Sequence, residues 1–217
     1  MEITWFGYSA FRIRTRDGFV VQDPYSGKAL GLASMPRTTA DIVTVSHDHS
    51  GHNNVDAVKG DPYIIRGPGE YEVKGMFIFG IPTYHDGKKG AIHGSNTVYV
   101  LDAEDLRVCH LGDLGHIPNQ SQAEAIGPID VLLIPVGDGA ALNATQAVEV
   151  INLLDPRFVI PMHYRLDGET TTLDTLDKFL RAMGAESKDV SRMEVLKLQK
   201  KDVPEEGTQL IILEAKR

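Results

Sequence analysis

The segment 41–52, Asp-Ile-Val-Thr-Val-Ser-His-Asp-His-Ser-Gly-His, ends an apolar, β-branched run in three histidines. Because side chains alternate along a strand, His47 and His49 point to one side and Asp48 to the other. A glycine then lets the chain turn, which brings His52 toward the same place. Neutral imidazole is the most common transition-metal ligand, and three imidazoles supply most of a metal shell. We therefore predict a metal site, around which the chain must bring strand ends together.

Two later apolar runs also end in residues that can bind a metal. The run 106–111 contains His110 and is followed, after a glycine, by Asp113. The run 158–162 is followed directly by His163. Sheet folds place functional side chains in the loops at the ends of strands. The three strand ends are therefore predicted to meet in one cluster.

Length and composition set limits on the remaining possibilities. The 217 residues are 42% hydrophobic and 24% charged, which is typical of a soluble globular protein, and we predict a single domain over 1–217. The net charge of −8 argues against a general binder of nucleic acids or anionic membranes. The single cysteine, Cys109, excludes an internal disulfide. Without an apolar span or a leader, the chain is predicted to be cytoplasmic, and homo-oligomerisation is left open.

Hydrophobic periodicity and turn residues divide the chain into many short strands and two late helices. Strands are predicted over 2–7, 10–15, 18–22, 42–45, 63–66, 70–73, 76–82, 97–102, 106–111, 131–136, 158–162, 193–199 and 209–214. Helices are predicted over 145–154, with Thr145 as N-cap, and over 173–183, while 26–40 is predicted to be a loop. This pattern favours an α+β fold of two sheets packed face to face, with helices outside.

Several motifs, taken in order, resemble those of the metallo-β-lactamase superfamily. They are Trp-Phe-Gly-Tyr-Ser-Ala-Phe at 5–11, Asp-Pro-Tyr at 23–25, His-Asp-His-Ser-Gly-His at 47–52, His-Leu-Gly-Asp at 110–113 and Pro-Met-His at 161–163. The opening motifs resemble its small, single-domain, lactonase-like branch of metal-dependent hydrolases. The resemblance implies a four-layer αββα sandwich with the metal site at one edge of the β-sandwich.

The resemblance also implies a ligand set. It assigns His47, His49 and His110 to a first metal site, Asp113 to a bridge between two metals, and His52 and His163 to a second site. The family pattern is His-x-His-x-Asp-His, and Gly51 stands where its aspartate would be. Glycine has no side chain to coordinate, so we expect the second site to bind its metal more weakly.

Four further side chains are candidates for supporting roles. His116 could protonate a leaving group, bind a substrate anion or replace the missing ligand, or it could be a loop histidine without a role. His85 could contact the substrate or support a ligand, and Asp23 could hold a ligating histidine through its free ring N–H or simply cap a turn. His93 is interpreted as a surface histidine. Cys109 points away from His110 and is predicted to be buried and inert.

These features predict a metal-dependent hydrolase. One or two ions per chain, with zinc favoured by the histidines and manganese allowed by the carboxylate, would activate a water held near Asp113. The expected substrate is a small ester, lactone or phosphodiester, and the charge of the metals would also accommodate an anion. Two alternatives remain open: a mononuclear iron oxygenase of the same fold, and a non-catalytic metal-binding protein.

Overall fold

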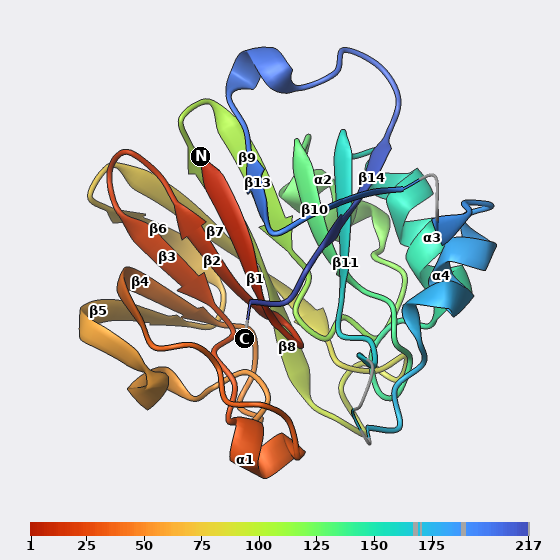
Figure 1. Ribbon diagram of the computed structural model, residues 1–217, viewed down its shortest axis with the longest axis horizontal. Coiled ribbons are helices and arrows are strands. Elements are labelled where there is room, and N and C mark those ends of the chain that lie inside the picture. Colours follow the sequence, from red (N-terminus) through yellow and green to blue (C-terminus); the bar gives the residue numbers. More distant parts are fainter. Residues whose placement is uncertain (167–168, 170, 188–189, 217) are drawn as a thin grey trace.

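The computed structural model describes residues 1–166, 169, 171–187 and 190–216. In this part of the chain, two β-sheets pack face to face, and the main helices lie on one outer side (Figure 1). The predicted α+β fold with two sheets is confirmed.

The first sheet has six strands in the described residues and is built mostly from the N-terminal part of the chain. They are β1 (Glu2–Gly7), β2 (Ala10–Arg14), β3 (Phe19–Gln22), β4 (Thr38–Val45), β5 (Val58–Arg66) and β13 (Val195–Lys197), in the order β13-β1-β2-β3-β4-β5. The first three form an antiparallel meander, whereas β3, β4 and β5 run parallel. Parallel strands end at the same edge, so the residues that follow β3 and β4 are neighbours.

The second sheet has eight described strands, and the first of them follows β5 in the chain. They are β6 (Gly69–Val73), β7 (Met76–Tyr84), β8 (Ser95–Ala103), β9 (Leu106–His110), β10 (Val131–Pro135), β11 (Phe158–Met162), β12 (Ser191–Met193) and β14 (Gln209–Leu213), in the order β12-β14-β11-β10-β9-β8-β7-β6. β9, β10 and β11 are parallel neighbours, and every residue of β10 and β11 is buried. Continuous apolar strands of this kind need cover on both faces.

Helices supply that cover. They are α1 (Gly27–Leu30), α2 (Gln120–Ile126), α3 (Ala144–Leu154) and α4 (Leu176–Ala182), with short 3₁₀ turns η1 (Val55–Ala57) and η3 (Lys200–Asp202). Figure 1 shows α3 and α4 beside β11 and β14, and α1 at the lower end of the first sheet. The layers thus follow the α–β–β–α order, with a thin first layer. No helix in the described ranges is both long and apolar enough to cross a membrane.

The core between the sheets holds the β4 end in place. Trp5, Phe11 and Tyr99 are at most 1% exposed there. The hydroxyl of Tyr99, on the second sheet, donates a hydrogen bond of 3.0 Å to the carbonyl of Val45, the last residue of β4. A buried hydroxyl needs such a partner, and this one fixes the strand end that leads into the histidine segment.

Local boundaries differ from the sequence-based predictions at several places. Asn143, not Thr145, caps α3, because its side chain accepts the Gln146 backbone N–H in a capping box. The strand predicted over 193–199 is two strands, β12 and β13, which join different sheets. The segment 26–40 includes α1 and the start of β4. The short helix α2 was not predicted.

Candidate metal centre

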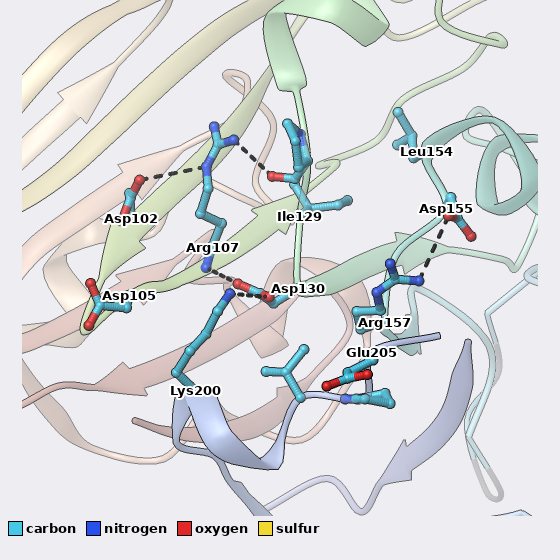
Figure 2. Close-up of a pocket in the computed structure, with 13 residues that line it drawn as sticks. Asp102, Asp105, Arg107, Ile129, Asp130, Leu154, Asp155, Arg157, Lys200 and Glu205 are labelled. Atoms are coloured by element: carbon cyan, nitrogen blue, oxygen red, sulfur yellow. Dashed lines mark hydrogen bonds and ion pairs between the residues drawn. The ribbon is translucent and has the colours of Figure 1, made fainter. Parts of the chain in front are cut away.

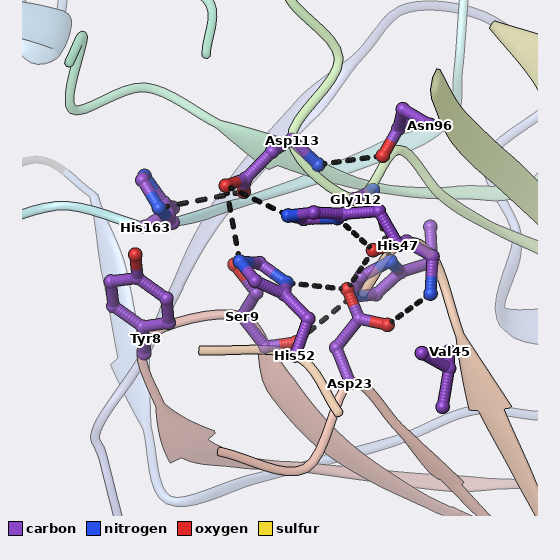
Figure 3. A network of polar contacts seen from close by, with 12 residues as sticks. Tyr8, Ser9, Asp23, Val45, His47, His52, Asn96, Gly112, Asp113 and His163 are labelled. Carbon is purple, nitrogen blue, oxygen red and sulfur yellow. Dashed lines mark hydrogen bonds and ion pairs between the residues drawn. The ribbon is translucent and has the colours of Figure 1, made fainter. Parts of the chain in front are cut away.

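Asp113 lies among four histidines at the edge where strands of both sheets end, and Figure 3 shows His47, His52 and His163 around its carboxylate. Its carboxylate oxygens face the histidine Nε2 atoms, at 3.0 Å for His52, 3.3 Å for His85, 3.4 Å for His163 and 3.8 Å for His47. The carboxylate is buried, and the backbone N–H of Asp113 donates a hydrogen bond of 3.1 Å to Asn96 Oδ1. A buried carboxylate surrounded by imidazoles is the arrangement that a shared metal ligand requires.

Asp23 and Ser46 set the orientation of two of these rings. Asp23, which follows β3, accepts His52 Nδ1–H at 2.7 Å and the Ser46 hydroxyl at 2.5 Å. Since the hydroxyl hydrogen points to Asp23, the Ser46 oxygen can only accept a hydrogen bond from His47 Nδ1–H, at 2.9 Å. Both rings therefore turn Nε2 toward Asp113. This is the supporting contact that the sequence suggested for Asp23.

His85 completes this inward-facing group. It follows β7, and its Nδ1 lies 3.3 Å from the carbonyl of Ala140, which leaves Nε2 directed at Asp113. One ligand atom each from His47, His49 and His85 lie within 4.8 Å of one another, and the same holds for His47, His52 and Asp113. The structure thus places His85 where a metal ligand would stand, closer to the centre than the supporting role we expected.

His110, which the resemblance assigned to the first site, is not brought into the cluster. Its Nε2 donates to the Ser9 carbonyl at 2.9 Å, and its Nδ1 accepts the Gly112 N–H at 3.0 Å. Both ring nitrogens are therefore used by the backbone, and the ring lies edge-on to Phe11. In this geometry His110 is a buried structural histidine that braces the turn leading to Asp113.

His116 is also absent from the cluster. Its Nδ1 donates to the Ile117 carbonyl at 2.9 Å, and its Nε2 accepts the Tyr84 backbone N–H at 3.3 Å. Neither nitrogen is free to transfer a proton at Asp113. The catalytic role considered for His116 is therefore not supported by its position.

The residues present fit a metal ion. Buried atoms without a hydrogen-bond partner are rare in folded proteins and call for an explanation. In the described part of the chain, several converge at this one place: Nε2 of His47, His52 and His163, and Oδ1 of Asp113. His52 Nε2 is close to Asp113 but lacks the geometry of a hydrogen bond. A cation among His47, His52 and Asp113, whose ligand atoms lie within 4.8 Å of one another, would give these unpartnered atoms a partner.

The charges of the metal-free cluster follow from burial and from the two carboxylates. Burial, reinforced by His52, lowers the pKa of His47 to about 3, so this ring is neutral. Burial would also lower the pKa of His52, but Asp113 and Asp23 outweigh it and raise that pKa to about 10. Burial would raise the pKa of Asp113, but His163 and His52 hold it well below its usual range. The carboxylate is thus ionised and ready to coordinate.

A cavity of about 230 Å³ opens onto this cluster. It is lined by Tyr8, Leu30, His49, Ser50, Gly51, His52, His85, His93, Asp113, Ala140, His163 and Leu173. None of these described lining residues is Lys or Arg. The loop after His85 reaches the rim because the Asp86 carboxylate accepts four backbone N–H groups, including that of His93 at 2.8 Å. His93 is exposed, as the sequence predicts, and it also lines the rim of the cavity.

A larger cavity lies elsewhere and has a different character (Figure 2). Its volume is about 710 Å³, and it is found where β9, β10 and β11 begin, whereas the cluster lies where they end. Its cations already have partners: Lys200 lies 2.9 Å from Asp130, and Arg107 donates to the Pro128 carbonyl at 2.8 Å. Because ligands of such sheets bind at the carboxyl ends of strands, the smaller cavity is the candidate site.

Comparison with known proteins agrees with this geometry. The family model described as a β-lactamase superfamily domain matches residues 2–163. The chain belongs to the metallo-β-lactamase superfamily. A solved structure from Thermotoga maritima, described as a candidate zinc-dependent hydrolase of this superfamily, is 36% identical, with a TM-score of 0.79 over 98% of this chain and 97% of that one.

Two other members of the superfamily fold show how far the similarity extends. A metal-dependent hydrolase from Pyrococcus horikoshii is 25% identical over 191 residues, 76% of this chain and 84% of that protein. A diiron β-hydroxylase from Streptomyces venezuelae is 16% identical, with a TM-score of 0.63 over 100% of this chain and 53% of that one. The second likeness concerns the fold alone.

The sequence did carry a signal for His85. It follows an apolar strand, as His163 does, and the same argument applies to both. The family resemblance assigns the first site to His110, whereas the structure brings His85 into the cluster. What separates the two histidines is the backbone contact of His110 with Ser9, which is remote in sequence.

Proposed function

We propose that this superfamily member is a metal-dependent hydrolase whose ion is held by His47, His49 and His85, with Asp113 beside them. The observation that carries the proposal is the grouping of ligand atoms: those of His47, His49 and His85 lie within 4.8 Å of one another, next to the buried, unpartnered atoms of His52 and Asp113. The donor set of neutral imidazoles with one carboxylate favours zinc, while the carboxylate also allows manganese. The metal-dependent hydrolases among the relatives support the same reaction class.

The residues of the centre would have separate roles in hydrolysis. A bound divalent ion would supply Lewis acidity and lower the pKa of water toward neutrality. Asp113 is an ionised, buried acceptor, so it can accept a hydrogen bond from a water and orient it. Asp23 keeps His52 oriented with Nε2 inward, and Asp113, His52 and His163 form a buried inner end of the cavity.

The cavity supports a small, neutral substrate. Leu30, Ala140 and Leu173 line it, and its volume of about 230 Å³ suits a small molecule. One divalent ion would be balanced by the carboxylates of Asp113 and Asp23, and no Lys or Arg of the described lining adds positive charge. A carboxylic ester or a lactone therefore fits better than an anionic phosphodiester.

The test is hydrolysis by chelator-treated protein that has been reloaded with zinc or manganese. We expect turnover of p-nitrophenyl acetate or a γ-lactone and none of bis-(p-nitrophenyl) phosphate, with a loss of about 100-fold or more in Asp113→Asn. His116→Gln serves as the comparison and should keep most of the activity, because His116 binds only backbone groups. Turnover of the phosphodiester alone would overturn the substrate class. Oxygen consumption with iron and no hydrolysis would favour the oxygenase alternative.

A further inference from the structure

Gly51 lies against the aromatic ring of Tyr8. A Cβ atom added to Gly51 would lie 2.6 Å from Tyr8 Cε1 and 3.4 Å from the Tyr8 hydroxyl oxygen. The first distance is well inside van der Waals contact, so no side chain fits at position 51 while Tyr8 holds its place. Tyr8 thus fills the space that an aspartate at position 51 would use.

The backbone gives no other reason for a glycine at this position. Gly51 is not among the glycines with positive φ, so its conformation is open to any residue. Tyr8, in contrast, has a φ of +52°, a left-handed conformation that is costly for an aromatic residue. The strained residue is the one that carries the side chain, which indicates that the placement of Tyr8 matters.

Contacts from both sheets hold Tyr8 in this conformation. Its carbonyl accepts the His163 N–H at 2.9 Å and Trp5 Nε1–H at 3.0 Å. Its ring packs on His163, with centroids 4.3 Å apart, and on His52, with centroids 5.3 Å apart. Figure 3 shows the Tyr8 hydroxyl directed upward, on the side of His163 and Asp113.

We propose that Tyr8 takes the place of a carboxylate ligand at position 51. The centre then holds one ion tightly, at His47, His49 and His85, and presents a hydroxyl where a second ion would need its carboxylate. A tyrosine hydroxyl can donate a hydrogen bond to a substrate oxygen, which an ionised aspartate cannot do. This inference rests on the proposed function for the ion, but the exclusion between Tyr8 and position 51 stands on geometry alone.

The first test is a double-mutant cycle of thermal unfolding on the metal-free protein. We expect Gly51→Asp to lower the unfolding temperature by about 5 °C, because its side chain overlaps Tyr8. The same change should cost much less in the Tyr8→Ala background, where the space is free. Gly87→Asp is the matched control, because a Cβ there has its nearest neighbour at 3.9 Å. Equal losses in both backgrounds would overturn the exclusion.

The second test is zinc titration with stoichiometry measured by equilibrium dialysis. We expect one tight ion in the natural chain and in Gly51→Asp, and a second ion bound at least 10-fold more tightly in the Tyr8→Ala/Gly51→Asp double variant than in Tyr8→Ala. Tyr8→Phe should keep the one tight ion. Two tight ions in the natural chain, or loss of an ion in Tyr8→Phe, would overturn the proposal. No ion in any variant would overturn the proposed function, while the unfolding cycle would still decide the exclusion.

Discussion

The backbone N–H of His163 donates a hydrogen bond of 2.9 Å to the carbonyl oxygen of Tyr8, and both residues have left-handed φ angles, of +53° and +52°. The bond joins the turn after β1, in the first sheet, to the end of β11, in the second. Left-handed backbone costs non-glycine residues about 1 kcal/mol or more each, and such strain gathers at functional sites. Here it sets a tyrosine ring against an imidazole of the candidate metal centre.

The first prediction is that His85 binds the metal and that His110 stabilises the fold. His85→Ala should abolish tight zinc binding and leave the metal-free protein nearly as stable, because its strongest contacts face the cluster. His110→Ala should retain zinc but lose about 3 kcal/mol of unfolding free energy, because it leaves a cavity and unpairs Ser9 and Gly112. Metal analysis and urea denaturation of both variants check this. Loss of zinc in His110→Ala, with unchanged stability, would restore the assignment made from the sequence.

Asp23 should control metal affinity without contacting the ion. In Asp23→Asn the charge that holds His52 is lost, and we expect zinc affinity to fall by about 10- to 100-fold. Asp130→Asn is the matched control, since Asp130 also accepts a backbone N–H, that of Arg107, but lies in the other cavity. Competition against a fluorescent chelator measures both. Equal affinities for the two variants would contradict the role of Asp23.

The stability of the metal-free protein should depend on pH in both directions. The pKa of His47 is lowered from 6.5 to about 3, so between these values the unfolded chain takes up a proton that the folded chain refuses, and stability falls with acid. Asp113, whose pKa is also lowered, keeps its full contribution above its ordinary value of 3.8 and loses it only at more acidic pH. His52 has its pKa raised to about 10, so its contribution is complete below 6.5 and is lost as pH rises toward 10. The unfolding temperature should therefore peak near neutrality. A flat profile in a pH series would show that these shifts are absent.

Asp86 should keep the rim of the cavity ordered. Its carboxylate accepts backbone N–H groups of four residues between Lys88 and His93, and these bonds lower its pKa. Asp86→Ala should make the loop 87–94 more sensitive to protease and should raise KM more than it lowers kcat. Lys88→Ala, a change of an exposed side chain in the same loop, is the control. Limited proteolysis with mass analysis of the first cut shows whether the loop has loosened.

Features of the fold and of the site that depend on neighbouring residues in the sequence could be predicted, whereas those that depend on contacts between remote residues could not. Strand ends and the histidine segment could be recognised because alternation and apolar runs are local patterns, and the structure brings His47, His49, His52, Asp113 and His163 together as expected. The metal roles of these side chains remain predictions. The choice between His85 and His110 could not be made, because it depends on a carbonyl from another strand pair.

The steric overlap between the Tyr8 ring and a side chain at position 51 could not be predicted from the sequence either. The glycine was visible as a departure from the family pattern, and the tyrosine was visible as part of an opening motif. Nothing in the sequence connects them, because their contact exists only once the turn after β1 has folded against the turn after β4. Steric exclusion between remote residues is a property of the assembled fold.

The proposed metal ligands follow strands of two different sheets, and this arrangement affects how stable the protein is in a cell. His47 and His49 follow a strand of the first sheet, and His85 and Asp113 follow strands of the second, so the proposed ion would cross-link the two sheets. At a free metal concentration 100-fold above its dissociation constant, such an ion adds about 2.7 kcal/mol to the folded state. Metal starvation would then act on abundance as well as on catalysis, because the chain that lacks its ion would open at this edge and become a substrate for proteases.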